Sequence, residues 1–291
     1  MTGLMRGCPL AADLGPLELP LYACGLLCFT RRSMPKQPDL KIPRSGLRVW
    51  VDCVLFYGIV VIFGIGGILT AVVGAVLYLV LPRQRGIRIG RWINLGLFRL
   101  FTWMIRGARL VYPDLEALDA LRDQKGVIIA PNHITALDAL FVISRLPNIV
   151  CIMKAELWDS PVFGGGSRLA GYLRNDMTSA MFRKASEELQ AGEQLLIFPE
   201  GTRGSERPIS PFKGGVGIIA QHSGAEVQSV LFECNTRYLG KGWSVWKLPR
   251  WPMIYRVRLG ERFRLEKNGN VKEFVAQLEE YYSRELEHSD L

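Results

Sequence analysis

Thirty consecutive residues, from Cys53 to Pro82, contain no charged side chain. An apolar run of this length is typical of a segment that lies in a lipid bilayer, and a buried core helix of a soluble protein is the alternative. As a single helix the run would be about 45 Å long, against a hydrocarbon core of about 30 Å. Either the helix crosses as one tilted span, or it breaks near Gly64, Gly66 and Gly67 and returns as a shallow re-entrant hairpin. We therefore predict that residues 49–82 form a transmembrane or re-entrant segment.

Basic residues flank this run on both sides. Residues 31–48 carry six Arg or Lys side chains against one acid, and residues 83–109 carry seven arginines and no acid. The combined net charge of these two windows exceeds the net charge of the whole chain, +9, so the rest of the chain is slightly acidic. Such flanks are typical of contact with anionic lipid headgroups, and their symmetry favours the hairpin over the single span. Because no basic-aromatic recognition motif occurs, we expect no nucleic-acid partner.

The stretch after the apolar run combines arginines with aromatic rings. Residues 89–107 include Trp92, Trp103, Arg91, Arg99 and Arg106. A helix of this composition is suited to the membrane interface, with its rings at the boundary and its guanidinium groups on phosphates. We predict an arginine-rich interfacial helix over residues 83–112, with a plain core helix as the alternative.

The N-terminal residues show no comparable pattern. Residues 1–33 lack periodicity, contain three prolines, and hold a thirteen-residue apolar patch, which is too short to span a bilayer. They also lack the charged start and cleavage site of a secretory signal. We interpret residues 1–48 as an irregular basic segment. Met34 precedes a basic, proline-containing sequence and is a second candidate for the native start.

From residue 113 the chain alternates between strand-like and helical runs. Short apolar runs predict strands at 127–130, 149–153, 195–198, 227–232 and 253–259, and helical periodicity predicts helices at 179–190, 215–223 and 271–286. This alternation is typical of an α/β domain whose mainly parallel sheet is flanked by helices. We assign residues 113–288 to that domain.

Two polar motifs each follow a predicted strand directly. Asn132–Asp138 follows the strand at 127–130, and Phe198–Arg203 closes the strand at 195–198. Because the carboxyl ends of parallel strands meet at one edge of a sheet, we expect the two motifs to lie together there.

The first motif supplies a candidate general base. A neutral imidazole is well matched to accepting a proton near pH 7, which selects His133. If residues 134–138 turn into the start of a helix, Asp138 returns beneath the ring, fixes its tautomer and stabilises the imidazolium. The chain contains no Gly-x-Ser-x-Gly nucleophile elbow. We therefore expect a substrate hydroxyl to attack directly, without a covalent enzyme intermediate.

The second motif has the features of an anion pocket. Gly201 lets the backbone approach a ligand closely, Thr202 offers a hydroxyl, and Arg203 offers a planar fork that suits phosphate oxygens. A strand-end turn with a surface pair of Arg203 and Glu200 is the alternative.

The cysteines and the other histidines suggest no metal site. The six cysteines have neither metal-ligand nor disulfide spacing, which predicts a reducing compartment. Cys24 and Cys28 lack a second Cys/His pair, and no motif surrounds His222 or His288. We expect no metal and no cofactor.

In this order and spacing, the two motifs resemble those of the glycerolipid acyltransferase family, most closely the 1-acylglycerol-3-phosphate (lysophosphatidate) acyltransferases. The resemblance covers about residues 110–240. It implies that His133 and Asp138 are the catalytic pair. It also implies that Glu200, Gly201, Thr202 and Arg203 bind the acceptor and its phosphate; we expect Glu200, which is out of place beside an anion, to hold Arg203 or a glycerol hydroxyl.

Further blocks extend the resemblance and also depart from it. Phe212-Lys213-x-Gly215 follows the family pattern and adds Lys213 to the phosphate site. Met177 stands where the family has an arginine, and Arg174 is the candidate to replace it. Gln228 follows Val227 where a proline is common. These departures leave the acceptor open.

The resemblance implies a glycerol-3-phosphate acyltransferase-like fold and an O-acyltransferase. The enzyme would move a fatty acyl group from acyl-CoA or acyl carrier protein to the free hydroxyl of a lysophospholipid. The first candidate acceptor is 1-acylglycerol-3-phosphate, giving phosphatidate, and the second is another lysolipid such as a lyso-aminolipid. A thioesterase or lipase with an unrecognised serine, and an inactive lipid-binding protein, are alternatives from other classes. A soluble thioester and a membrane-resident lysolipid place the site at the cytoplasmic face of a membrane, which we expect to be a bacterial inner membrane.

Overall fold

The computed structural model describes residues 46–203, 208–236 and 251–287. All of these residues belong to the unit Pro43–Leu291. The predictions for the irregular N-terminal segment, apart from its last three residues, and for Met34 as a second start lie outside the described residues.

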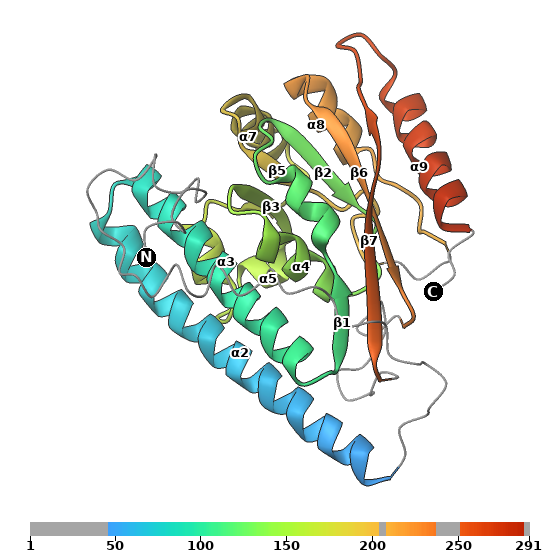
Figure 1. The fold of residues 1–291 in the computed structure, drawn as a ribbon. Coiled ribbons are helices and arrows are strands. Elements are labelled where there is room, and N and C mark those ends of the chain that lie inside the picture. Colours follow the sequence, from blue (N-terminus) through green and yellow to red (C-terminus); the bar gives the residue numbers. More distant parts are fainter. Residues whose placement is uncertain (1–45, 204–207, 237–250, 288–291) are drawn as a thin grey trace, which may run out of the picture. The chain divides into compact units, whose positions relative to one another are not determined.

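A seven-stranded sheet holds the described residues together, in the order β1-β7-β6-β2-β5-β3-β4 (Figure 1). All neighbouring strands are parallel except β6 and β7, which are antiparallel. The predicted α/β fold with a mainly parallel sheet is therefore confirmed. The strands are β1 (Val111–Asp114), β2 (Val127–Pro131), β3 (Ile149–Lys154), β4 (Leu173–Asn175), β5 (Gln194–Leu196), β6 (Glu226–Cys234) and β7 (Met253–Phe263).

Helices cover both faces of this sheet and divide the core into two layers. Successive residues of a strand point to opposite faces. Ile128 therefore packs with the helices α7 (Ser179–Gln190), α8 (Gly215–Ser223) and α9 (Val271–Glu287), whereas Ile129 packs with α3 (Arg83–Gly107) and α4 (Leu137–Arg145). Burial on both faces explains why these strands appear in the sequence as continuous apolar runs. After the long N-terminal helices, the structure has η3 (Glu116–Leu121), α4 (Leu137–Arg145), α5 (Ala155–Trp158), α6 (Gly164–Leu169), α7 (Ser179–Gln190), α8 (Gly215–Ser223) and α9 (Val271–Glu287).

The apolar run forms one continuous helix, α2 (Leu47–Val80), so the favoured hairpin is not present. Of the glycines that suggested a break, Gly64 has no neighbour within 4 Å, whereas Gly67, like Gly74 further along α2, packs closely on the segment around α6. A Cβ atom added to Gly67 would lie 2.5 Å from Val162 Cγ1, and one added to Gly74 would lie 3.1 Å from the carbonyl oxygen of Gly165. Within the described residues, α2 is the one helix that is long and apolar enough to cross a membrane, on length and composition alone.

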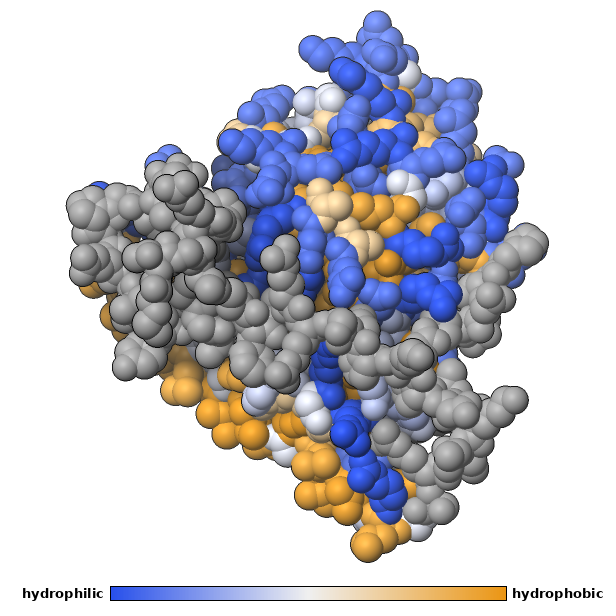
Figure 2. Space-filling view, in the orientation of Figure 1, coloured by the Kyte–Doolittle hydropathy of each residue, from blue (hydrophilic) through white to orange (hydrophobic). Residues whose placement is uncertain are grey.

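Two sides of α2 have different surroundings. Phe56, Ile59 and Phe63 are buried in the same core layer as α3. Large apolar side chains elsewhere on the helix are exposed, among them Val54, Ile65, Val72 and Leu79. Figure 2 shows this apolar surface running along α2. The helix is thus joined to the domain along one side and open along another.

The next helix, α3 (Arg83–Gly107), is partly a core helix. Its Leu95, Phe98, Phe101 and Ile105 are buried, and the last three belong to the core layer that also contains side chains of α2 and α4. Trp103 remains 59% exposed, so the helix also keeps an outer surface. The alternative of a core helix is therefore correct for the inner face, and the interfacial role of the outer face stays a prediction.

The arginines of α3 do not all face outward as expected. Arg91 is 5% exposed; it pairs with Glu193 and Glu188 and donates to the carbonyl oxygen of Ala170. Arg99 donates to the carbonyl oxygen of Ser144 at 2.8 Å, and burial lowers its pKa to about 10. Arg91 therefore joins α3 to the domain and is not available to headgroup phosphates.

The sheet begins before the predicted boundary at residue 113. Helix α3 ends at Gly107, and β1 begins at Val111 by pairing with β7. The strands β1 (sequence VYPD) and β4 (sequence LRN) were both missed, because each contains polar residues and lacks the apolar run that indicated the equally short β5.

Candidate functional site

The two polar motifs leave the same edge of the sheet from neighbouring strands. β2 and β5 are parallel and pair Ile128 with Leu195 and Ile129 with Leu196. The predicted convergence of the motifs is confirmed. Asn132, directly after β2, exchanges two hydrogen bonds with the backbone of Phe232 at 2.7 and 3.0 Å, which fixes the start of the first loop.

His133 and Asp138 form a hydrogen-bonded pair. His133 Nδ1 lies 3.0 Å from Asp138 Oδ2, because the chain turns after His133 and enters α4 at Leu137. The same oxygen accepts the backbone N–H groups of Ile134 at 2.7 Å and Thr135 at 2.8 Å. Asp138 is fully buried, whereas the His133 side chain is 16% exposed. The carboxylate can only accept hydrogen bonds, so Nδ1 carries the proton and Nε2 is left to accept one.

Glu200 has a different role from the one predicted. Its Oε1 accepts the backbone N–H of His133 at 2.7 Å, and its Oε2 accepts the backbone N–H of Ser210 at 3.0 Å. The side chain is 2% exposed and does not line the cavity. Burial raises the pKa of Glu200, and the two backbone N–H groups oppose that shift. Glu200 therefore fixes the backbone of the His133 loop against the second motif.

A cavity of about 430 Å³ brings the remaining groups together. His133 lines it, as do Gly201, Thr202, Arg203 and Lys213. Gly201 has a φ of +66°, and a Cβ at this position would lie 2.7 Å from Lys213 Cδ. Glycine thus permits both the backbone turn and the close approach of Lys213. Two cationic side chains therefore share the cavity with the imidazole.

Arg174 lies apart from these groups. Its guanidinium pairs with Asp159 at 3.1 Å and with Asp176, and it is not among the cavity-lining residues. Met177 does line the cavity, with a φ of +52°. The proposed replacement of the family arginine by Arg174 therefore does not occur in this structure. Neither ion pair was predictable, because Asp159 and Asp176 have no motif around them.

Residues 113–233 match the family model described as Acyltransferase, and this segment contains both motifs. The chain therefore contains an Acyltransferase-family domain.

Several proteins of known name are similar to part of this chain. The 1-acyl-sn-glycerol-3-phosphate acyltransferase of Helicobacter pylori is 30% identical over 116 residues, which cover 38% of this chain and 49% of that protein. A putative 1-acyl-sn-glycerol-3-phosphate acyltransferase of Caenorhabditis elegans is 29% identical over 150 residues, which cover 48% and 54%. The chain thus matches about half the length of these relatives.

A solved structure shares the fold over a longer stretch. The 1-acyl-sn-glycerophosphate acyltransferase of Thermotoga maritima superposes with a TM-score of 0.61 at 19% identity, covering 83% of this chain and 95% of that one. At this identity the likeness concerns the fold alone.

Within the acyltransferase domain, two side chains of the cavity were not singled out from the sequence, the ring of Phe198 and the thiol of Cys151. Phe198 stacks on the imidazole, with ring centroids 3.9 Å apart and an interplanar angle of 24°. Cys151 also lines the cavity, and burial raises the pKa of its thiol to about 12. Phe198 could have been found, because it opens the second motif. Cys151 carries no such signal, since it lies within an ordinary apolar strand.

Proposed function

We propose that this protein transfers a fatty acyl group from an acyl thioester to the free hydroxyl of 1-acylglycerol-3-phosphate, giving phosphatidate. The observation that carries the proposal is a single cavity containing an oriented imidazole, His133, together with the cations Arg203 and Lys213. A base beside two cations suits an acceptor that has both a hydroxyl and a phosphate. The names of the similar proteins support the same reaction.

In the proposed reaction, Nε2 of His133 accepts the proton of the acceptor hydroxyl as its oxygen attacks the thioester carbonyl. The new C–O ester bond forms, the C–S bond breaks, and His133 returns the proton to the thiolate that leaves. Asp138 holds the Nδ1–H group throughout and stabilises the imidazolium between the two proton transfers. Acyl-CoA and acyl carrier protein supply the same thioester, and either fits this scheme.

The lining of the cavity argues against a thioesterase or lipase. Its described residues include no serine, and their hydroxyl and thiol groups belong to Thr202 and Cys151. With a pKa of about 12, the Cys151 thiol stays protonated near neutral pH and is a poor nucleophile. The acceptor hydroxyl is therefore the better candidate for direct attack.

Two acceptors are candidates for this cavity. Met177 lines the cavity where the family has an arginine, and Arg174 is engaged elsewhere. This observation keeps a second candidate in place, an acyltransferase for another lysolipid, such as a lyso-aminolipid. An alternative acceptor that carries a phosphate would still bind Arg203 and Lys213 through it.

We also propose that the protein works attached to a membrane, at its cytoplasmic face. The exposed apolar side of α2 supports attachment, and the exposed Arg83, Arg85 and Arg88 at the start of α3 suit anionic headgroups. A lysolipid acceptor resides in the membrane, whereas a thioester donor reaches it from the cytosol.

The test is a transfer assay with labelled acyl-CoA or acyl carrier protein and a panel of lysolipids. We expect phosphatidate from lysophosphatidate with the wild type. His133→Ala should lower kcat by about 10²- to 10⁴-fold, and Asp138→Asn nearly as much, because it can impose the wrong tautomer. His222→Ala is the matched control, since His222 is an exposed residue of α8. Wild-type turnover by folded His133→Ala would overturn the mechanism, and a preference for another lysolipid would select the second candidate.

A further inference from the structure

The hydrogen bonds behind Asp138 continue beyond the residues of the first motif. The hydroxyl of Thr135 lies 2.9 Å from Asp138 Oδ1, 3.0 Å from the backbone nitrogen of Leu137 and 2.8 Å from the hydroxyl of Tyr255. A carboxylate can only accept and a backbone N–H can only donate. The single Thr135 proton must therefore point to Asp138, so the Tyr255 hydroxyl donates to Thr135. All hydrogen-bonding positions of Thr135 are then filled.

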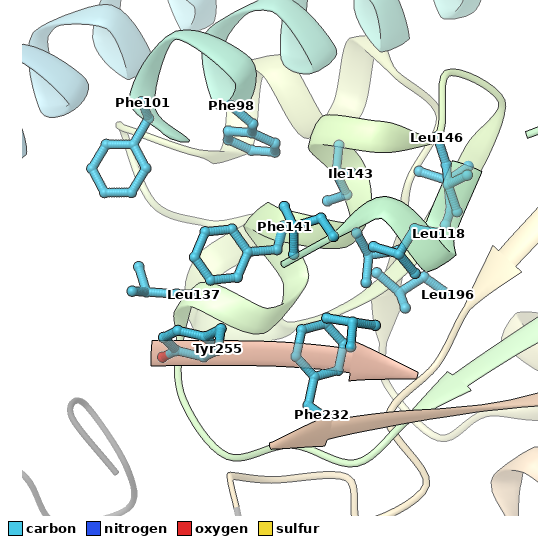
Figure 3. Close-up of a cluster of buried hydrophobic side chains, with 14 of the residues drawn as sticks. Phe98, Phe101, Leu118, Leu137, Phe141, Ile143, Leu146, Leu196, Phe232 and Tyr255 are labelled. Carbon is cyan, nitrogen blue, oxygen red and sulfur yellow. The ribbon is translucent and has the colours of Figure 1, made fainter. Parts of the chain in front are cut away.

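Tyr255 is held firmly at the end of this chain of contacts. It is 1% exposed and sits in β7 between Pro113 of β1 and Cys234 of β6. Its ring meets Phe141 of α4 edge to face, with centroids 5.0 Å apart. Figure 3 shows Tyr255 on its strand beside Phe141 and Leu137. Because β7 runs antiparallel to β6, its beginning lies at the sheet edge where the two motifs meet.

The Tyr255 hydroxyl is a permanent donor in this position. Burial, followed by the nearby Cys234 and Asp138, raises its pKa well above the ordinary value. The phenol therefore stays neutral at any working pH and keeps its proton for Thr135. Tyr255 lies outside the segment that matches the family model, which ends at residue 233.

We propose that Tyr255 is a positioning residue for the His133–Asp138 pair and acts through Thr135. Its hydroxyl orients the Thr135 hydroxyl, which fixes the Asp138 carboxylate and through it the ring of His133. Rotation of Asp138 away from Nδ1 would weaken the hold on the imidazolium. The kinetic consequences rest on the proposed acyltransfer, whereas the effect on the imidazole itself does not.

The first experiment compares Tyr255→Phe with Tyr281→Phe in the full-length protein. Each change removes one largely buried phenol hydroxyl and keeps the ring; the Tyr281 hydroxyl accepts the backbone N–H of Glu261 and has no link to Thr135. We expect Tyr255→Phe to lower kcat about tenfold with unchanged KM for both substrates. Tyr281→Phe should leave kcat unchanged, even if it lowers the thermal stability as much as Tyr255→Phe does. Equal kcat for wild type and Tyr255→Phe would overturn the proposal.

The second experiment reads the imidazole directly and needs no substrate. The chain has three histidines, so NMR of histidine-labelled protein in detergent micelles gives few signals, and His133→Ala assigns the relevant one. We expect the His133 titration to move to lower pH in Tyr255→Phe, because a loosened carboxylate stabilises the imidazolium less. His222 should titrate identically in every variant. An unchanged His133 titration would make Tyr255 a packing residue.

Other ionisable groups near the pair remain in place in all of these variants. They come from the strands and loops packed around it: Cys151, Lys154, Glu156, Glu200, Arg203, Lys213 and Cys234. Tyr255→Phe also removes a side-chain contact with Cys234, so the titration shift is assigned to the Thr135 contact by the double-mutant cycle below. If the wild type fails to acylate lysophosphatidate but the shift is present, the proposed acceptor is wrong and the positioning role stands.

A double-mutant cycle tests whether Tyr255 acts through Thr135. Thr135→Val removes the intermediate hydroxyl, so adding Tyr255→Phe should lower kcat and the His133 pKa no further. Thr135→Ser keeps a hydroxyl and should retain the response to Tyr255→Phe. A tenfold loss in the Thr135→Val background equal to that in wild type would mean that Tyr255 acts by another route. If the Thr135→Val variant does not fold, Thr135→Ala, which also removes the hydroxyl, takes its place in the cycle.

Discussion

Glu200 and Arg203 stand three residues apart in one motif, yet they serve different parts of the site. Glu200 is buried and joins the backbones of His133 and Ser210, whereas Arg203 lines the cavity with Lys213. A buried carboxylate requires its oxygens to be hydrogen-bonded, and two backbone N–H groups meet that requirement. One short motif thus fixes the backbone of His133 through Glu200 and places a cation in the cavity through Arg203.

For a single residue, the proposed phosphate contact can be tested by measuring the KM for the lysolipid and the KM for the acyl thioester separately. Arg203→Ala should raise the KM for the lysolipid by much more than the KM for the acyl thioester, since lost ground-state binding appears in KM. Arg203→Lys should recover part of the loss, because lysine has no bidentate fork. Arg174→Ala is the matched control and should change neither constant, because its side chain pairs with Asp159 outside the cavity. An equal rise in both constants for Arg203→Ala would indicate a structural role instead.

Among the elements, α2 and α3 lie close to the rest of the domain at glycines, where a larger residue would clash with the neighbouring backbone. A Cβ at Gly90 of α3 would lie 2.7 Å from the backbone atoms Ala170 N and Leu169 C. Gly67 and Gly74 of α2 meet the backbone of residues 162–165 in the same way. Such contacts explain why the long apolar helix stays straight along the domain and does not fold back at its glycines.

The packing of α3 gives a paired prediction for thermal unfolding of the purified protein. Gly90→Ala should lower the stability by about 1–3 kcal/mol, because the backbone of residues 169–170 cannot move aside easily. Gly96→Ala, on the same helix, has nothing within 4 Å of its added Cβ and should raise stability by up to about 1 kcal/mol through helix propensity. Destabilisation of both variants to the same extent would contradict close packing at Gly90.

On the scale of the whole molecule, the proposed membrane attachment rests on two exposed features, the apolar side of α2 and the arginines at the start of α3. Removing residues 1–82 would also take Phe56, Ile59 and Phe63 out of the core, so α2 is not a detachable anchor. Arg91 belongs to the interior, which leaves Arg83, Arg85 and Arg88 for headgroups. Attachment is therefore best tested in the full chain.

The prediction concerns partition between anionic and neutral vesicles after reconstitution. Changing Arg83, Arg85 and Arg88 together to Gln should remove most of the preference for anionic vesicles at low salt, since each basic residue contributes about 1 kcal/mol there. At high salt the variant and the wild type should behave alike, because screening shortens the reach of the charges. A control variant neutralises three exposed cations on α7 and α9, namely Arg183, Lys272 and Arg284. If that control loses the same preference, the arginines of α3 have no special role.

The sequence by itself determined the helices and motifs that are specified by residues close together in the chain. The helices α7 and α8 begin and end at the predicted residues, since one helical face repeats within a few positions and the caps lie beside it. The two motifs were found for the same reason, because each follows its own apolar strand within a few residues. Their meeting at one sheet edge followed from the parallel arrangement alone.

Only the tertiary structure decided which distant groups complete each buried polar contact. Glu200 lies 67 positions from His133, and Tyr255 lies 120 positions from Thr135. No pattern in either segment names its partner, because a buried donor or acceptor is satisfied by whatever group the fold brings near. The burial of Arg91 and the unbroken course of α2 are likewise decided by tertiary contacts. The sequence shows that these helices contain arginine and glycine, but only packing against the domain decides which groups those residues contact.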